Sequence, residues 1–193
     1  MTQQSILEQD GRAVPYIVEG EGPVSLVLIS GRELNGDGLG VVAHYLAEEA
    51  GFHVVRIGPR ADSSGQDRAT TLHDRVEDAA LVIDHLGLDH TWIGGHALGG
   101  TAARIFAAQH TDRVNGLLLL GVEEDEIALA PAIPVLIVQA TDDQVTPSAT
   151  AEALRSTAPE RASIKTVDGA DHLFPATHPI ETAVIIEEYL DWD

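Results

Sequence analysis

A glycine-rich turn in the middle of the chain is the segment whose residue types and spacing point most directly to chemistry. Residues 94–100 read GGHALGG and lie between a short apolar run and a helical pattern. In the motif G-x-S-x-G, such a strand-to-helix turn holds a serine in a strained conformation and exposes its hydroxyl for nucleophilic attack. Glycines are needed around it because neighbouring backbone must approach without meeting a Cβ. Here the central residue is Ala97, whose methyl group cannot attack a carbonyl.

Alternating apolar runs and helical patterns must position this turn. The runs 6–9 and 14–19 flank the pair Asp10-Gly11, which favours a hairpin. The later runs are typical of strands buried on both faces, so with right-handed crossovers they predict one α/β domain, residues 1–193, with a doubly wound, mostly parallel sheet and an antiparallel N-terminal hairpin. The expected parallel strands are 24–29, 53–57, 91–94, 114–120, 135–138 and 164–167, and the expected helices are 41–49, 70–86, 101–109, 148–155 and 180–190.

Three further segments carry a resemblance to the α/β-hydrolase family, and with the glycine-rich turn they follow the family's order over nearly the whole chain. The first, Ser30-Gly31-Arg32, follows the first expected parallel strand, where the family usually has His-Gly. The second, residues 140–147 (ATDDQVTP), follows a strand and is similar to the family's acid loop. The third, residues 168–174 (DGADHLF), follows the last strand and is similar to the loop that carries the family's histidine. The resemblance implies the α/β-hydrolase fold and hydrolase chemistry of the esterase or thioesterase type.

The resemblance also implies a role for one or two residues in each segment. The backbone N–H groups of Arg32 and Leu98 would form the oxyanion hole. Asp143, the aspartate four residues before a proline, matches the family's acid better than Asp142 does. His172 matches the histidine that acts as general base. In such an arrangement the carboxylate fixes the imidazole tautomer and stabilises the imidazolium.

Four other residues are expected near the substrate. Ser30 stands where the family usually has histidine. His96 precedes the central residue of the turn and is expected to pack beside the site rather than to transfer protons. Glu33, in the loop after Arg32, either contacts substrate or is a solvated loop residue. Phe174 is expected to contribute to the apolar wall of the pocket.

Three hypotheses account for Ala97. In the first, the natural enzyme has serine here and the present chain carries an inactivating substitution, because the rest of the apparatus is kept. In the second, Ala97 is natural and His172 with Asp143 acts as a general base on water or on a substrate proton, in hydrolysis, lyase or cyclisation chemistry. In the third, the protein is a non-catalytic small-molecule binding protein. In a serine-dependent enzyme, loss of the nucleophile costs on the order of a millionfold in turnover.

The connection between the strands expected to end at Leu120 and to begin at Val135 is too short for a cap domain. An open site above the strand ends is therefore expected, with residues 58–68 as a loop near it. The implied substrate is a small ester, thioester, lactone or related carbonyl compound. No metal or organic cofactor is implied, because the acidic residues lack the spacing of a calcium loop and the histidines lack that of a metal site.

Composition limits the partners. The formal charge of −20, from 31 acidic and 11 basic residues, argues against binding to nucleic acid and to anionic membranes. The chain contains no cysteine, which excludes disulfides and thiolate metal sites. Its first residues do not resemble a signal peptide, so a cytoplasmic location is expected. The oligomeric state is left open by the sequence.

Overall fold

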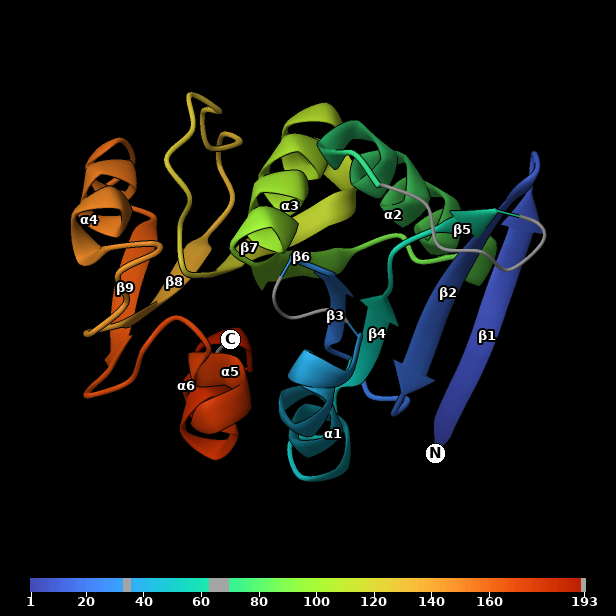
Figure 1. Ribbon diagram of the computed structural model, residues 1–193, viewed down its shortest axis with the longest axis horizontal. Helices are drawn as coiled ribbons and strands as arrows, with labels where there is room; N and C mark the ends of the chain where they lie inside the picture. Colours follow the sequence, from blue (N-terminus) through green and yellow to red (C-terminus); the bar gives the residue numbers. More distant parts are fainter. Residues whose placement is uncertain (33–35, 63–69, 192–193) are drawn as a thin grey trace.

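The computed structural model, which describes residues 1–32, 36–62 and 70–191, contains one twisted sheet with helices on both faces (Figure 1). The strand order is β1-β2-β4-β3-β6-β7-β8-β9, and β5 pairs with β2 off this path. Strand β2 is antiparallel to β1, β4 and β5, whereas the pairs from β4 through β9 are parallel. This confirms the predicted doubly wound sheet with its N-terminal hairpin. The strands are β1 (Thr2–Gln9), β2 (Arg12–Glu19), β3 (Ser25–Ile29), β4 (His53–Ile57), β5 (Ala61–Asp62), β6 (Thr91–His96), β7 (Val114–Leu120), β8 (Val135–Ala140) and β9 (Ala162–Val167).

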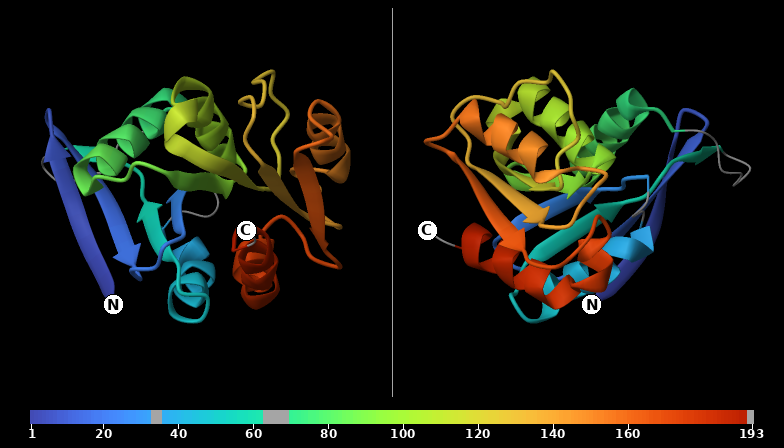
Figure 2. Two further views of the ribbon diagram at one scale, coloured as in Figure 1. Left: turned by 180° about the vertical axis from the view of Figure 1, so that it is seen from behind. Right: turned by 60° about the vertical axis from the view of Figure 1, so that its left-hand side comes forward.

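The helices form two layers. Helices α2, α3 and α4 cover one face of the sheet, and α1, α5 and α6 cover the other (Figures 1 and 2). Alternate residues of a strand point to opposite faces, so Val27 packs in the core beneath the first layer and Leu28 in the core beneath the second. The helices are α1 (Gly40–Glu48), α2 (Leu72–Leu86), α3 (Leu98–Gln109), α4 (Ser148–Ser156), α5 (Phe174–Thr177) and α6 (Pro179–Leu190), with 3-10 turns at Gly36–Leu39 and Thr111–Arg113.

The turn between β6 and α3 is tighter than the sequence predicted. The expected strand 91–94 continues to His96, and the expected helix 101–109 begins at Leu98. Gly94 and Gly95 have little intrinsic preference for a strand, but β3 and β7 pair with them on both sides. Ladder hydrogen bonds from two neighbours therefore extend the strand up to the turn, and Ala97 alone separates strand from helix.

The sequence did not predict the short elements β5 and α5, because neither contains a long apolar pattern. Strand β5 lies within the expected loop 58–68, of which residues 63–68 fall outside the described residues. Helix α5 has only four residues and begins two residues after His172. Helix α2 begins two residues later than expected, because Thr71 caps it: its hydroxyl accepts from Asp74 N, and Asp74 accepts from Thr71 N.

The carboxyl ends of the parallel strands carry the loops in which site residues are expected. Ser30 follows β3, Ala97 follows β6, and Asp143 lies in the loop after β8. Residues 121–134, between β7 and β8, contain neither helix nor strand, so no cap domain is inserted there. Among the described helices, none is long and apolar enough to cross a membrane.

Candidate active site

Ala97 has a backbone conformation that L-residues rarely adopt. Its φ is 48° and its ψ is −106°, directly between β6 and α3. Its N–H donates to the carbonyl of Leu120 at 3.0 Å, and its carbonyl accepts from Thr101 N at 3.0 Å. These bonds to β7 and α3 hold the strained residue in place. The turn therefore has the backbone geometry of a nucleophile elbow, with a methyl group at its centre.

Glycines allow the loop after β3 to lie against this elbow. A Cβ on Gly99 would come within 2.1 Å of the Ile29 carbonyl oxygen, and one on Gly95 within 2.6 Å of the same atom. On the opposite side, a Cβ on Gly31 would lie 2.6 Å from the His96 carbonyl oxygen. Side chains at these three positions would force the backbones apart. The missing Cβ atoms thus bring the segment that contains Arg32 next to the beginning of α3.

His172 and Asp143 come together at the carboxyl end of the sheet. His172 Nδ1 lies 2.9 Å from Asp143 Oδ2 and 3.1 Å from Oδ1, and both residues are buried. Two backbone bonds join their loops: Thr141 N donates to the carbonyl of Val167, and Asp142 N donates to that of Ala170. An Nδ1–H that donates to a carboxylate leaves Nε2 as the basic nitrogen of a neutral imidazole.

Asp143 is held by donors on several sides. Val145 N and Thr146 N donate to Oδ1 at 2.9 and 2.8 Å, and the Thr146 hydroxyl donates to Oδ2 at 2.6 Å. Burial raises the pKa of Asp143, but the bonds from Thr146 and His172 outweigh it and hold the pKa below its ordinary value. The carboxylate is therefore ionised at neutral pH and can orient His172.

His96 packs against His172, and Phe174 packs against His96. His96 and Phe174 are fully buried. His96 Nε2 donates to the backbone carbonyl of His172 at 2.7 Å, and the two imidazole rings lie 4.4 Å apart. Phe174 contacts His96 edge-on at 6.1 Å. Both residues pack behind His172, and neither lines the cleft beside the elbow. Their expected contact with substrate stays a prediction.

Ser30 bonds to an arginine that sequence reasoning did not single out. Arg75 Nη1 donates to the Ser30 carbonyl at 2.5 Å and to its hydroxyl at 2.8 Å. Ser30 is buried, and its bonds to Arg75 hold the loop before Arg32. Its expected contact with substrate stays a prediction. Glu33, expected near the substrate, lies outside the described residues.

A cleft of about 590 Å³ lies beside the elbow. Its walls include Arg32, Arg75, Leu98, Thr101, Glu123 and Thr146. Arg32 Nη1 pairs with Glu123 at 2.9 Å, and Glu123 also accepts from the Thr101 hydroxyl at 2.8 Å. Leu98 is the first residue of α3, where backbone N–H groups have no acceptor within the helix. The cleft therefore places both expected oxyanion-hole residues, Arg32 and Leu98, on one surface.

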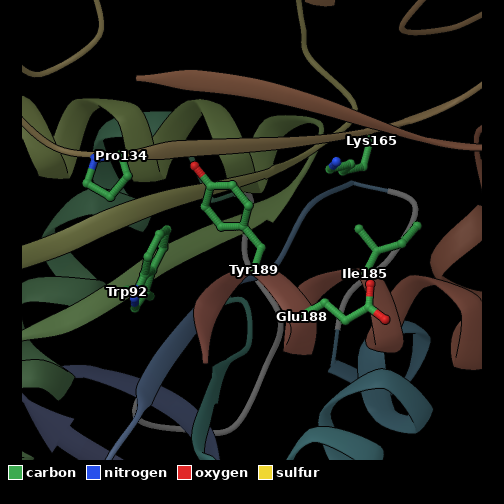
Figure 3. Close-up of a pocket in the computed structure, with 6 residues that line it drawn as sticks. All are labelled: Trp92, Pro134, Lys165, Ile185, Glu188 and Tyr189. Atoms are coloured by element: carbon green, nitrogen blue, oxygen red, sulfur yellow. The ribbon is translucent and has the colours of Figure 1, made fainter. Parts of the chain in front are cut away.

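A second cavity, of about 530 Å³, lies away from these residues. It is formed by Trp92, Pro134, Lys165, Ile185, Glu188 and Tyr189 (Figure 3). Trp92 is the second residue of β6 and Pro134 precedes β8, so this cavity belongs to the amino-terminal edge of the sheet. Ligands of open α/β sheets bind at the carboxyl edge. The candidate active site is therefore the cleft at Arg32 and Leu98.

Two residues of this site were missed by sequence reasoning. Thr146 precedes the proline of the acid loop, and its position three residues after Asp143 is the one signal that could have indicated a hydrogen bond back to the carboxylate. Arg75 lies in the first turn of α2, and no local pattern distinguishes it from a solvated arginine. Among the described residues, no cluster of three or more histidine, aspartate or glutamate side chains could hold a metal ion.

Known proteins share both the sequence pattern and the fold. Residues 25–175 match the model of an alpha/beta hydrolase family. A predicted CIB-like hydrolase from Thermoplasma acidophilum superposes with a TM-score of 0.83 at 19% identity, and 98% of each chain is covered. A thermophilic esterase from Thermogutta terrifontis gives 0.82 at 18% identity, again with 98% of each chain covered. The thioesterase domain of the curacin biosynthetic pathway gives 0.80 at 14% identity, with 96% of this chain and 100% of that chain covered. The chain therefore belongs to the α/β-hydrolase family.

Proposed function

We propose that this protein acts on a small ester, thioester, lactone or related carbonyl compound, with His172 as general base. The observation that carries the proposal is the contact of 2.9 Å between His172 Nδ1 and Asp143 Oδ2, beside the cleft that contains Leu98. The esterase and thioesterase among the proteins of similar fold support this class of substrate. No part of the mechanism needs a metal or organic cofactor.

In the chain as it stands, water is the nucleophile. His172 Nε2 accepts a proton from water as the water oxygen attacks the carbonyl carbon. The N–H groups of Arg32 and Leu98 stabilise the oxyanion. When this intermediate collapses, the bond to the leaving alcohol or thiol breaks and the imidazolium returns the proton to that group. One ester and one water thus give one acid and one alcohol, and His172 regains its initial state.

A second candidate is that the natural enzyme has serine at position 97. The present chain would then be an inactivated form of a serine hydrolase. The strained φ of 48° at Ala97 favours it. Such strain costs on the order of 1–3 kcal/mol, and it presents a serine hydroxyl to substrate but gives an alanine nothing comparable.

One set of variants distinguishes these candidates. We expect the unsubstituted protein to hydrolyse p-nitrophenyl acetate or a short acyl thioester above background, and His172→Ala to abolish that rate. Ala97→Ser should add a burst of product and covalent labelling by a fluorophosphonate probe, because a hydroxyl would then lie at the elbow. Activity in Ala97→Ser alone would support the inactivated serine hydrolase. Absence of His172-dependent turnover in both proteins, when both are folded, would overturn the proposed function and leave a binding protein.

A further inference from the structure

Arg75 is a buried guanidinium at the wall of the cleft, and none of the described residues is its acidic partner. Only 9% of the residue is exposed, and this part lines the cleft. Nη1 donates to Ser30, and Nε has no acceptor among the described residues. In the part of the chain that the structure describes, no carboxylate forms an ion pair with Arg75. A buried charge without a counter-ion is costly, so Arg75 would be stabilised by an anion in the cleft.

The nearby acid Asp78 is committed elsewhere. It accepts from Arg60 Nε at 3.0 Å and from Arg60 Nη2 at 2.6 Å. Burial lowers the pKa of Arg75, the charge of Arg32 lowers it further, and Asp78 raises it only in part. The guanidinium nevertheless remains charged at neutral pH. Its position therefore favours a negative partner that the described residues do not supply.

A second guanidinium and a helix end face the same cleft. The Arg32 side chain is 62% exposed, and its pair with Glu123 is of the surface kind, which contributes little and exchanges readily. Thr71 and Leu72, at the beginning of α2, also line the cleft. The amino-terminal end of a helix carries partial positive charge. At α2 this partial charge is offset by the Asp74 carboxylate that caps the helix, so Arg32 is the positive group that acts on Arg75 in the cleft.

The opposite wall limits how much negative charge the cleft accepts. Glu123, Glu124 and Asp125 lie there. Glu123 is already bonded to Arg32 and Thr101. Glu124 and Asp125 are exposed at the rim and repel ions that carry several negative charges. A single carboxylate on an otherwise neutral molecule fits this distribution better than a phosphate does.

We propose that Arg75 and Arg32 form a carboxylate-binding subsite, so that the substrate is a small carbonyl compound that also carries one free carboxylate. A monoester of a short dicarboxylic acid is the simplest member of this class. A guanidinium N–H donates a charge-assisted hydrogen bond to a carboxylate. Because Nη1 of Arg75 is bonded to Ser30 and Nε is buried, Nη2 is the nitrogen of Arg75 that would donate to the ligand. Arg32 would contribute its side chain to the carboxylate and its backbone N–H to the oxyanion, which requires a short linker between the two groups. The identity of the reacting group rests on the proposed function, whereas carboxylate binding does not.

Binding can be measured without turnover by using a ketone, which is not hydrolysed. Isothermal titration calorimetry of the whole chain should detect levulinate, a ketone with one carboxylate, and should show binding at least about tenfold weaker for 2-pentanone, its uncharged counterpart, and for inorganic phosphate. Arg75→Met and Arg32→Gln should each weaken levulinate binding by about tenfold, the change expected for loss of a charge-assisted bond. Arg155→Gln is the matched control, because Arg155 pairs with Glu152 on the surface of α4 and does not line the cleft. It should change levulinate binding less than about twofold.

Equal binding of levulinate and 2-pentanone, or equal loss in Arg155→Gln and Arg32→Gln, would overturn the subsite. Arg32→Gln decides the question if Arg75→Met does not fold, since Arg32 is exposed and its removal leaves Ser30 in place. Turnover of monomethyl succinate and of dimethyl succinate separates the two proposals. Hydrolysis of both with equal kcat/KM rejects the subsite and keeps the proposed function. Levulinate binding without hydrolysis of either ester, by the unsubstituted protein and by Ala97→Ser alike, keeps the subsite and rejects the proposed function.

Discussion

The hydroxyl of Thr146 donates a hydrogen bond of 2.6 Å to Oδ2 of Asp143, the same oxygen that lies 2.9 Å from Nδ1 of His172. Thr146 Oγ1 is itself 3.2 Å from that nitrogen. The neutral hydroxyl of Thr146 thus contacts both the carboxylate and the imidazole. Thr146 is a positioning residue for the candidate general base, because it acts on His172 through Asp143.

Thr146→Val keeps the shape of the side chain and removes this donor. We expect the free energy of unfolding at pH 7 to fall by about 2 kcal/mol, the contribution of a hydrogen bond to a charged group. The pKa of Asp143 is held below its ordinary value, so the stabilisation is complete at neutral pH and is lost as the pH falls through that lowered pKa. Urea unfolding at pH 7 and below about pH 4 should show the difference between variant and parent shrinking in acid.

Thr146→Ser is the control for that substitution, since it retains the hydroxyl. It should recover most of the lost stability and the ester hydrolysis rate. A deficit in Thr146→Ser as large as in Thr146→Val, or a deficit of the same size at both pH values, would show that the methyl group and not the hydrogen bond matters.

Gly121→Ala tests the space behind this hydrogen bond. Gly121 has a φ of +73°, and a Cβ there would lie 2.6 Å from the Thr146 hydroxyl oxygen. Gly169 has the same φ, but a Cβ there would meet no atom within 4 Å. Gly169→Ala should therefore cost only the backbone strain, about 1 kcal/mol, whereas Gly121→Ala should cost about 3 kcal/mol because Thr146 must also move. Equal losses in thermal or urea unfolding would contradict the close contact.

Ala97→Gly tests the strain at the elbow. Glycine adopts φ of 48° without a steric penalty, and relief of that strain should offset the loss of a buried methyl group and the greater entropy of the unfolded chain. We expect the free energy of unfolding to change by less than about 0.5 kcal/mol. Ala107→Gly, at a buried position inside helix α3, gains no such relief and should lose about 1.5–2 kcal/mol. A similar loss in both variants in urea unfolding would indicate that Ala97 is not strained.

Arg60 and Asp78 form a buried ion pair behind the cleft. Arg60 Nη2 lies 2.6 Å from Asp78 Oδ1, and both residues are at most 3% exposed. Arg60→Met should lower the free energy of unfolding by about 3–5 kcal/mol, because it leaves a buried carboxylate without its partner. The double variant with Asp78→Leu should be much less destabilised than the sum of the single variants. Additive losses in a double-mutant cycle would argue against direct coupling.

Local patterns in the sequence were sufficient for the order and most bounds of the elements. The expected strands 53–57 and 114–120 have the observed bounds, because a short run rich in valine, isoleucine or leucine that ends at a glycine is a local signal. The order of motifs also selected Asp143 and His172, which lie 29 positions apart and meet in the structure. Their catalytic roles stay predictions.

Tertiary structure alone decided what surrounds these residues. Ser30, His96 and Phe174 are buried, which the sequence did not predict, since exposure depends on which distant segments pack against a side chain. Arg75 meets Ser30 across 45 positions, and no pattern within a single helix reveals that contact. The elbow shows most clearly what the sequence determined and what the tertiary structure decided. Its glycines and Ala97 are visible in the sequence, but the bonds that hold Ala97 at φ of 48° come from β7 and α3, because strain persists only where surrounding structure enforces it.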